Sequence, residues 1–332
     1  MKVLITAPGF EKVIDSLKDI ADVELTFDKM GRSFTEEELV HIVSRYDAVI
    51  VWIDPLRAAA IEAAQTRLKV IGVPRAGYDN VDANAATRCN IPVIYAPGAN
   101  AVAVADFAMG LLLAINRGIA TANLLLKTGN WQTRWAMSAG SNLEGKTLGI
   151  LGLGNIGCRV AIRAKAFGMD IIAYDPYLTE DSMTTLGFFP RELSVKLVDF
   201  HTLLTESDFI TIHTPITKHT FKMIGATELA LMKKTAYIIN TSRGSIIDEQ
   251  ALQNAITTGQ IAGAALDVFE TEPLQPNHPF LDRDNVIVTP HIAWCTHESL
   301  HRVNMIVAHE VKNILQGKTP NRRYVANPEV LR

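Results

Sequence analysis

The sequence predicts an α/β protein with two doubly wound parallel-sheet domains joined by two helices. Short β-rich runs alternate with helical patterns along the chain, which is typical of βαβ units and of parallel sheets covered on both faces. A long apolar helical pattern separates two such series. The length of 332 residues also favours two domains over one.

The first series of expected strands lies in the first hundred residues, in KVLIT, VELTF, AVIVW, LKVIGV and PVIYAP. A proline-free helix is expected from about Val102 to Thr128, as a connector between the domains. The second series is TLGILGL, DIIAYD, FITIHT, AYIIN, IAGAALDVF and VIVTP. A helix from about His297 to Gln316 should return the tail to the first domain. The predicted domains are residues 1–102 with 292–332, and residues 103–291.

Charge and hydropathy exclude several kinds of partner. The formal net charge is -3 and no block of lysine or arginine occurs, so the electrostatic footprint of a nucleic-acid binder or an anionic-membrane binder is missing. The N-terminal apolar run is too short for a signal peptide, and FAMGLLLAI is about half a membrane span. We therefore expect small-molecule partners, with neither membrane nor nucleic acid involved.

The cysteines indicate the compartment. Cys89, Cys158 and Cys295 are widely separated and lack the spacing of metal ligands, so neither a disulfide framework nor a metal site is expected. A reducing cytoplasm fits this pattern best.

The strongest local motif is LGLGNIG, which follows an expected strand and begins an expected helix. Gly152 permits a tight turn, Gly154 lets backbone amides approach a pyrophosphate, and Gly157 allows close helix packing. Asp175 ends the next strand, where an acid would accept hydrogen bonds from the hydroxyls of an adenosine ribose. No Lys or Arg is adjacent to Asp175, so the pattern predicts NAD as the cofactor in preference to NADP.

Three later segments each follow an expected strand: NTSRGSIID, ALDVFETEP and TPHIAW. In a doubly wound sheet the carboxyl ends of the strands line the ligand crevice, so Arg243, Glu272 and His291 could converge there. This set suits hydride chemistry on a 2-oxo acid: an arginine to hold the carboxylate, a histidine to exchange the proton, and an acid to orient it. Each residue also has an ordinary alternative: Arg243 as a helix-capping or ion-pair residue, Glu272 as a solvated loop acid, and His291 as a cap.

From end to end the chain resembles the D-isomer-specific 2-hydroxyacid dehydrogenases. The resemblance rests on RAGYDNVDANAATRCNIPVIYAPGAN, ADFAMGLLLAINR, LGLGNIG with YDP, HTPITKHT, NTSRG, ALDVFETEP and TPHIA, which occur in the family's order. It is similar to the branches of 3-phosphoglycerate dehydrogenase and of glycerate or hydroxypyruvate reductase. The family implies a flavodoxin-like substrate (catalytic) domain built from both chain ends, an inserted NAD-binding Rossmann domain, and a homodimer held mainly by the cofactor domains.

The resemblance also implies site residues. Arg243 would bind the substrate carboxylate, Glu272 would partner the histidine, and His291 would be the general acid in reduction and the base in oxidation. Ala76 and Gly77 match a backbone loop that binds substrate. The implied cofactor-site residues, besides the glycines, Asp175 and His291, are Val104, Asn155, Ile156, Thr214, Pro215, Thr241, Ser242 and Asp267.

Departures from the family bear on the substrate, which could be phosphoglycerate-like or glycerate, hydroxypyruvate or glyoxylate. Phosphoglycerate dehydrogenases usually place an arginine after the third strand, where this chain has Trp52 and Ile53. Arg75 and Arg134 remain as basic candidates, and Tyr78 lies near the expected site. Trp294 is either an aromatic wall of the pocket or an interdomain packing residue. The chain ends at Arg332, so no appended regulatory domain for serine feedback is expected.

Other functions on this frame stay open. A formate dehydrogenase would carry glutamine at the position of Glu272, so the acid argues against it. Phosphite oxidation keeps the same three catalytic residues. An NADH-sensing corepressor, which is not an enzyme, would usually carry extended disordered tails, and we expect none here.

Overall fold

The computed structural model describes residues 1–26, 32–131, 139–178 and 194–331. The chain forms two compact units, which are described separately. Unit 1 contains Met1–Asn100 and Cys295–Arg332, and unit 2 contains Ala101–Trp294. The sequence placed the two boundaries at 102/103 and 291/292.

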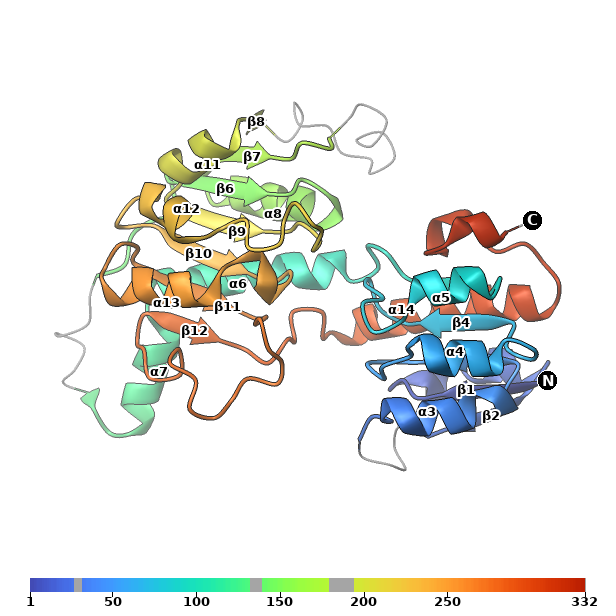
Figure 1. Cartoon of the computed structure of the whole chain (residues 1–332). Coiled ribbons are helices and arrows are strands. Elements are labelled where there is room, and N and C mark those ends of the chain that lie inside the picture. Colours follow the sequence, from blue (N-terminus) through green and yellow to red (C-terminus); the bar gives the residue numbers. More distant parts are fainter. Residues whose placement is uncertain (27–31, 132–138, 179–193, 332) are drawn as a thin grey trace. The chain divides into compact units, whose positions relative to one another are not determined.

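Unit 1 is built on a five-stranded parallel sheet (Figure 1). The strand order is β2-β1-β3-β4-β5, which is the flavodoxin-like order. The strands are β1 (Lys2–Ile5), β2 (Asp22–Leu25), β3 (Ala48–Ile50), β4 (Val70–Val73) and β5 (Val93–Tyr95). The helices are α1 (Asp15–Lys18), α3 (Glu36–Ile42), α4 (Ala58–Ala64), α5 (Ala83–Arg88) and α14 (His297–Leu315).

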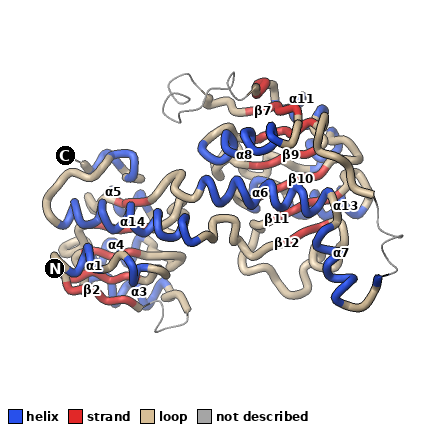
Figure 2. The backbone as a smooth tube through the Cα atoms, turned by 180° about the vertical axis from the view of Figure 1, so that it is seen from behind, coloured by secondary structure: helices blue, strands red, loops and turns tan. Residues whose placement is uncertain are grey.

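Side-chain alternation along these strands makes a core on each face of the sheet. Val49 and Ile71 point to the face covered by α3, α4 and α5. Their chain neighbours Ile50 and Val70 point to the other face, which α1 and α14 cover (Figure 2). The tail also joins the sheet, because Val325 forms an antiparallel bridge with Ile94. The chain therefore returns to its first unit, as the sequence predicted.

Unit 2 is built on a seven-stranded parallel sheet with the order β12-β11-β10-β9-β6-β7-β8. The strands are β6 (Thr147–Leu151), β7 (Asp170–Tyr174), β8 (Val195–Leu197), β9 (Phe209–Ile212), β10 (Tyr237–Asn240), β11 (Gly263–Leu266) and β12 (Val286–Val288). The helices are α6 (Ala101–Asn116), α7 (Ile119–Lys127), α8 (Asn155–Ala166), α11 (Phe200–Glu206), α12 (Ala226–Leu231) and α13 (Glu249–Thr257). The chain runs outward from β6 through β7 and β8, then crosses back to β9. The strand order thus reverses between β6 and β9, which is where doubly wound sheets bind ligands.

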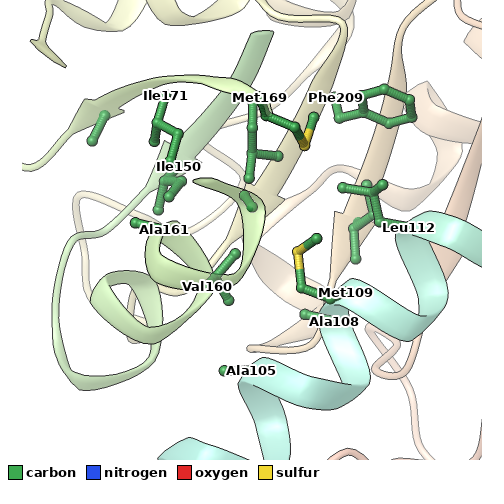
Figure 3. Close-up of a cluster of buried hydrophobic side chains, with 14 of the residues drawn as sticks. Ala105, Ala108, Met109, Leu112, Ile150, Val160, Ala161, Met169, Ile171 and Phe209 are labelled. Carbon is green, nitrogen blue, oxygen red and sulfur yellow. The ribbon is translucent and has the colours of Figure 1, made fainter. Parts of the chain in front are cut away.

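The two faces of this sheet are filled in the same alternating way. Ile150 of β6 and Phe209 of β9 pack with α6 and α8. Met109 of α6 lies across from Val160 of α8, and Leu112 lies beside Phe209 (Figure 3). Ile210 of β9 packs on the opposite face, in the core that includes residues of α11, α12 and α13. Strands buried on both faces explain why the sequence shows continuous apolar runs in this half.

Two sequence predictions need correction. The expected helix from Val102 to Thr128 is two helices, α6 and α7, bent by 66°. Gly118 takes a left-handed conformation with φ of 58° between them. The side chain of Asn116, the last residue of α6, donates to the Ser141 carbonyl and accepts from the Ser141 hydroxyl. In addition, β8 was not predicted. It is a three-residue edge strand, VKL, whose two exposed residues hide its strand character.

The helices expected to join the domains each pack within one unit. Helix α6 packs on β10, β11 and α8 of unit 2, and α14 packs on β4, β5 and α1 of unit 1. Within the described ranges, no single helix has the length and hydropathy of a membrane span. The bent pair of α6 and α7 meets these two criteria when taken together, and α6 is largely buried in the core of unit 2.

Candidate functional site

The glycine-rich turn lies between β6 and α8, at the point where strand order reverses. Gly152 has φ of 93°, and a Cβ there would lie 2.8 Å from the His213 carbonyl oxygen. A Cβ on Gly157 would lie 2.2 Å from the Gly152 carbonyl oxygen, so helix and turn approach too closely for a side chain. A Cβ on Gly154 would meet open space instead. The three glycines therefore meet the separate demands of a dinucleotide turn: a left-handed bend, free access and close packing.

Helix α8 supplies the donors at this turn. Its N-cap is Gly154, and no side chain caps its first turn, which begins with Asn155 and Ile156. The free amides and the positive end of the helix dipole suit a pyrophosphate. The residues present thus fit a dinucleotide.

Asp175 follows β7 and is held against the same turn. Its Oδ2 accepts a hydrogen bond from the Leu153 amide at 3.0 Å, and its Oδ1 accepts one from the Tyr177 amide at 3.0 Å. The carboxylate is therefore fixed beside the glycine-rich turn, as an acid that reads an adenosine ribose must be.

The other side of the strand reversal is formed by segments after β9 and β10. Thr214 follows β9, and its carbonyl accepts a short hydrogen bond from the Ser242 hydroxyl, so the two predicted cofactor segments are joined. Within the described part of the chain, Oγ1 of Thr241 and Nδ1 of His213 are buried without a hydrogen-bond partner. Burial lowers the pKa of His213 to about 3, so this ring is neutral. The orphaned hydroxyl marks a polar position at the strand ends that a bound cofactor could satisfy.

His291 and Glu272 meet, although they come from different loops. Nδ1 of His291 lies 2.8 Å from Oε2 of Glu272, and Oε1 of Glu272 accepts a hydrogen bond from the Phe269 amide at 3.1 Å. The side chains are 29% and 37% exposed, so the pair is accessible to a ligand. Because the carboxylate accepts at Nδ1, Nε2 is the ring atom left to exchange a proton.

The charge state of Glu272 follows from its neighbours. Burial raises the pKa of Glu272, but the hydrogen bond and the positive charge of His291 lower it. The Phe269 amide and the Arg243 charge act in the same direction, and the pKa ends below its usual value. Glu272 is therefore a carboxylate that accepts from the histidine.

A third residue, Asp267, fixes the loop that carries His291. It directly follows β11, is fully buried, and accepts from the Thr289 hydroxyl at 2.6 Å. It also accepts from the amides of Ile292 at 2.9 Å and Ala293 at 2.8 Å. Burial raises the pKa of Asp267, against these hydrogen bonds and the charge of His291. From the sequence, Asp267 is expected only to contact the cofactor; its position directly after a strand is the signal that could have predicted a loop anchor.

Arg243 follows β10, the strand next to β11. One guanidinium nitrogen donates to the Ser242 carbonyl at 2.8 Å, and the Arg243 carbonyl accepts from Nδ2 of the Asn240 side chain at 2.9 Å. Gly244 packs so tightly that a Cβ would lie 1.9 Å from the Phe269 carbonyl carbon. This contact joins the arginine segment to the loop of Glu272. Arg243, Glu272 and His291 are thus placed at the ends of three neighbouring strands.

A charged network that was not predicted reinforces this junction. The Glu249 amide donates to Glu270 and the Glu270 amide donates to Glu249, each at 3.0 Å. Lys222 lies 3.0 Å from Glu270, and His278 lies 2.8 Å from Glu249. The first acid of FETEP therefore ties its loop to the start of α13, while the second acid reaches the histidine.

The remaining predicted residues are placed as follows. Val104 lies on α6 and is buried, and Pro215 is exposed after β9. Arg75, Ala76 and Gly77 lie in unit 1, directly after β4. The Arg75 guanidinium carbon lies 5.8 Å from the centroid of the Trp52 ring. Arg134 lies outside the described residues.

The neighbouring aromatic residues take defined contacts. Tyr78 packs edge-on against Tyr95 in unit 1, with ring centroids 5.1 Å apart. In unit 2, the Trp294 indole nitrogen donates to the His291 carbonyl at 2.8 Å. The sequence left Trp294 between two roles, and this contact is neither of them.

Comparison with known proteins gives consistent matches. Residues 109–293 match the model of the D-isomer specific 2-hydroxyacid dehydrogenase NAD binding domain. The chain is 42% identical over 331 residues to D-3-phosphoglycerate dehydrogenase of Archaeoglobus fulgidus, covering 99% of this chain but 60% of that protein. It is 37% identical over 334 residues to glyoxylate reductase of Korarchaeum cryptofilum, covering 100% of this chain and 97% of that protein. The chain therefore spans 60% of the length of the first relative and nearly all of the second.

Solved structures give the same result. A glyoxylate reductase from Paecilomyes thermophila matches with a TM-score of 0.85 and 29% identity, covering 99% of both chains. The match to the family's NAD-binding domain agrees with the glycine turn and Asp175, so unit 2 is a nicotinamide-dinucleotide domain with NAD as its cofactor.

Proposed function

Because this chain belongs to the D-isomer-specific 2-hydroxyacid dehydrogenase family, we propose that it interconverts a small D-2-hydroxy acid and its 2-oxo acid, with hydride transfer between C2 and NAD(H). The observation that carries this proposal is the 2.8 Å contact between Nδ1 of His291 and Glu272 at the strand ends beside Arg243. An acid, a proton-exchanging ring and a guanidinium at one sheet edge are the groups that this reaction needs.

Each residue has a task in the proposed reaction. The Arg243 guanidinium holds the substrate carboxylate through parallel hydrogen bonds and polarises the neighbouring ketone. Nε2 of His291 delivers a proton to the ketone oxygen in reduction and removes it from the hydroxyl in oxidation. Glu272 fixes the ring orientation through Nδ1 and balances the positive charge. The bound nicotinamide supplies or accepts the hydride.

The family resemblance assigns recognition of the substrate beyond C2 to residues of unit 1. Ala76 and Gly77 offer backbone amides after β4, and Arg75 offers a charge beside Trp52. The relatives reported above include a phosphoglycerate dehydrogenase and glyoxylate reductases. We propose a substrate of this range: phosphoglycerate-like, or glycerate, hydroxypyruvate or glyoxylate.

A turnover panel tests the function. The protein is mixed with NADH and separately with glyoxylate, hydroxypyruvate, phosphohydroxypyruvate and pyruvate, and nicotinamide absorbance is followed. We expect oxidation of NADH with at least one of them. Binding of NADH without turnover of any acid would favour an NADH-sensing regulatory protein, and reduction of NAD by phosphite alone would favour phosphite dehydrogenase.

The cofactor preference has its own test. The carboxylate of Asp175 lies beside the glycine turn, where it would repel a 2′-phosphate. Asp175→Ser should therefore reduce the preference for NADH over NADPH in kcat/KM. An unchanged ratio would mean that Asp175 does not face the ribose.

We also propose that the protein is a homodimer that associates through α7 of unit 2. Within this helix no residue is buried, yet Ile119, Leu124 and Leu126 are 54%, 63% and 53% exposed. Apolar side chains of this size gathered on one short helix are typical of an interface. Sedimentation should show a dimer for the wild type and a monomer for Leu124→Glu with Leu126→Glu. An unchanged dimer would place the interface elsewhere.

The three cysteines support a reducing compartment such as the cytoplasm. Cys89, Cys158 and Cys295 are all free thiols. Thiol titration of the unfolded protein isolated from its host should find all of them reduced; a disulfide-linked species would contradict this location.

A further inference from the structure

The backbone of His291 takes an unusual conformation. Its φ is 54°, in the left-handed region that residues with a Cβ rarely adopt. Such a conformation persists only when the surroundings hold it in place, and it is found most often at functional sites. The conformation also sets the direction of the Cα–Cβ bond, and therefore where the imidazole can reach.

Hydrogen bonds surround this residue on every backbone side. Its own amide donates to the Thr289 carbonyl at 3.0 Å, and the next two amides donate to Asp267. Neither Thr289 nor Asp267 binds the carbonyl of His291. It accepts from the indole of Trp294, three residues further on, at 2.8 Å.

We propose that Trp294 is a positioning residue that keeps His291 in the left-handed conformation by binding its carbonyl. This rests on the proposed function, in which His291 exchanges the proton. Without the indole, rotation of the peptide between His291 and Ile292 meets less resistance, and the ring can leave the direction required for proton transfer. Glu272 holds Nδ1 but does not fix the backbone that carries the ring.

The contact is neither of the two roles that the sequence left open for Trp294, but it engages the polar atom of the side chain. An indole nitrogen has one hydrogen and no acceptor. That hydrogen points to the His291 carbonyl, so the indole has no donor left for a substrate carboxylate or hydroxyl. The polar part of this side chain therefore acts on the histidine.

The test is Trp294→Phe, which keeps an aromatic ring and removes the donor. We expect kcat for the best 2-oxo acid to fall about five- to tenfold, as the loss of one hydrogen bond in the transition state predicts, with KM and the Kd of NADH changed less than about twofold. Trp131→Phe, the same change at an exposed tryptophan of unit 2, is the matched control and should leave all three unchanged. A rise in KM with normal kcat would make Trp294 a pocket wall and overturn the proposal.

A second measurement does not depend on turnover or on the folding of the variant. In nitrogen-15 spectra of the wild type, the Trp294 indole signal can be assigned by substituting the other three tryptophans in turn. We expect its proton to exchange with solvent much more slowly than the indole protons of the unfolded protein; equally rapid exchange would refute the contact. If the wild type turns over no 2-oxo acid, the proposed function fails, while this result still tests the geometry.

Discussion

Each unit contains a buried aspartate that fixes a loop after a strand, and the two anchored loops differ in the residues that they carry. In unit 1, Asp54 accepts from the Thr6 hydroxyl and from the amides of Phe34 and Trp52. In unit 2, Asp267 accepts from the Thr289 hydroxyl and two amides. In each unit, the threonine and the aspartate follow two adjacent strands, which are β1 and β3 in unit 1 and β12 and β11 in unit 2.

The loops that these aspartates hold carry different residues. The loop of Asp54 presents Trp52, against which Arg75 lies. The loop of Asp267 presents His291, with its left-handed backbone and its contact to Glu272. In the proposed reaction, the same anchor would support the surroundings of a substrate-binding arginine in unit 1 and a proton-exchanging histidine in unit 2. Damage to unit 2 should therefore lower kcat, and damage to unit 1 should raise KM.

The largest expected effect comes from removing the reacting group. His291→Gln should lower kcat at least about 100-fold, which is the low end of a general-acid contribution, with NADH affinity little changed. Steady-state kinetics and a fluorescence titration with NADH measure the two quantities. Near-normal turnover would refute the catalytic role of His291, and with it the proposed difference in function between the two anchored loops.

The next effect compares the two anchors directly. In Asp267→Asn and in Asp54→Asn, an NH2 group replaces one carboxylate oxygen and faces a backbone or hydroxyl donor. Each variant should therefore have a free energy of unfolding about 1–3 kcal/mol lower than that of the wild type. Only Asp267→Asn should also lower kcat, by about 10- to 100-fold, because it displaces His291. Denaturant unfolding and kinetics on the same samples test this. An equal loss of kcat in both variants would show that the anchors do not differ in function.

A smaller effect concerns acid stability. The folded pKa of Glu272 lies below its unfolded value, so its ionisation stabilises the fold fully above the unfolded pKa of about 4.3. That stability is lost as pH falls through 4.3 toward the lower folded pKa. Between pH 5 and pH 3, the free energy of unfolding should therefore fall less in Glu272→Gln than in the wild type. Denaturant unfolding midpoints measured at steps of about one pH unit test this. Glu11→Gln, at an exposed position of unit 1, should follow the wild type; parallel curves for all three proteins would refute the contribution of Glu272.

The smallest effect lies in unit 1. Trp52→Leu removes the ring beside Arg75, an interaction of about 0.5–1 kcal/mol at an exposed site. We expect KM for the 2-oxo acid to rise about two- to fivefold with kcat unchanged, while Ile53→Leu, at the exposed neighbouring position, leaves both unchanged. A fall in kcat without a change in KM would reverse the division of labour between the units.

Much of the fold could be predicted because strands buried on both faces must be apolar along their length. Each of the predicted β-rich runs contains a strand, and the closing helix ends within one residue of its prediction at Gln316. Prediction failed where the local signal was weak. The edge strand β8 exposes two of its three residues, and Gly118 ends α6 inside a stretch whose apolar pattern continues into α7.

The class of the fold, the glycine turn with its acid, and the catalytic candidates could be predicted from the sequence, because each depends on residue type and on position after a strand. Which of these groups meet depends on the folded structure. The 2.8 Å contact of His291 with Glu272 and the anchoring by Asp267 join separate loops. The indole of Trp294 donates to the carbonyl of His291, whose backbone is left-handed. These contacts depend on backbone direction and on strand order, which residue spacing does not record.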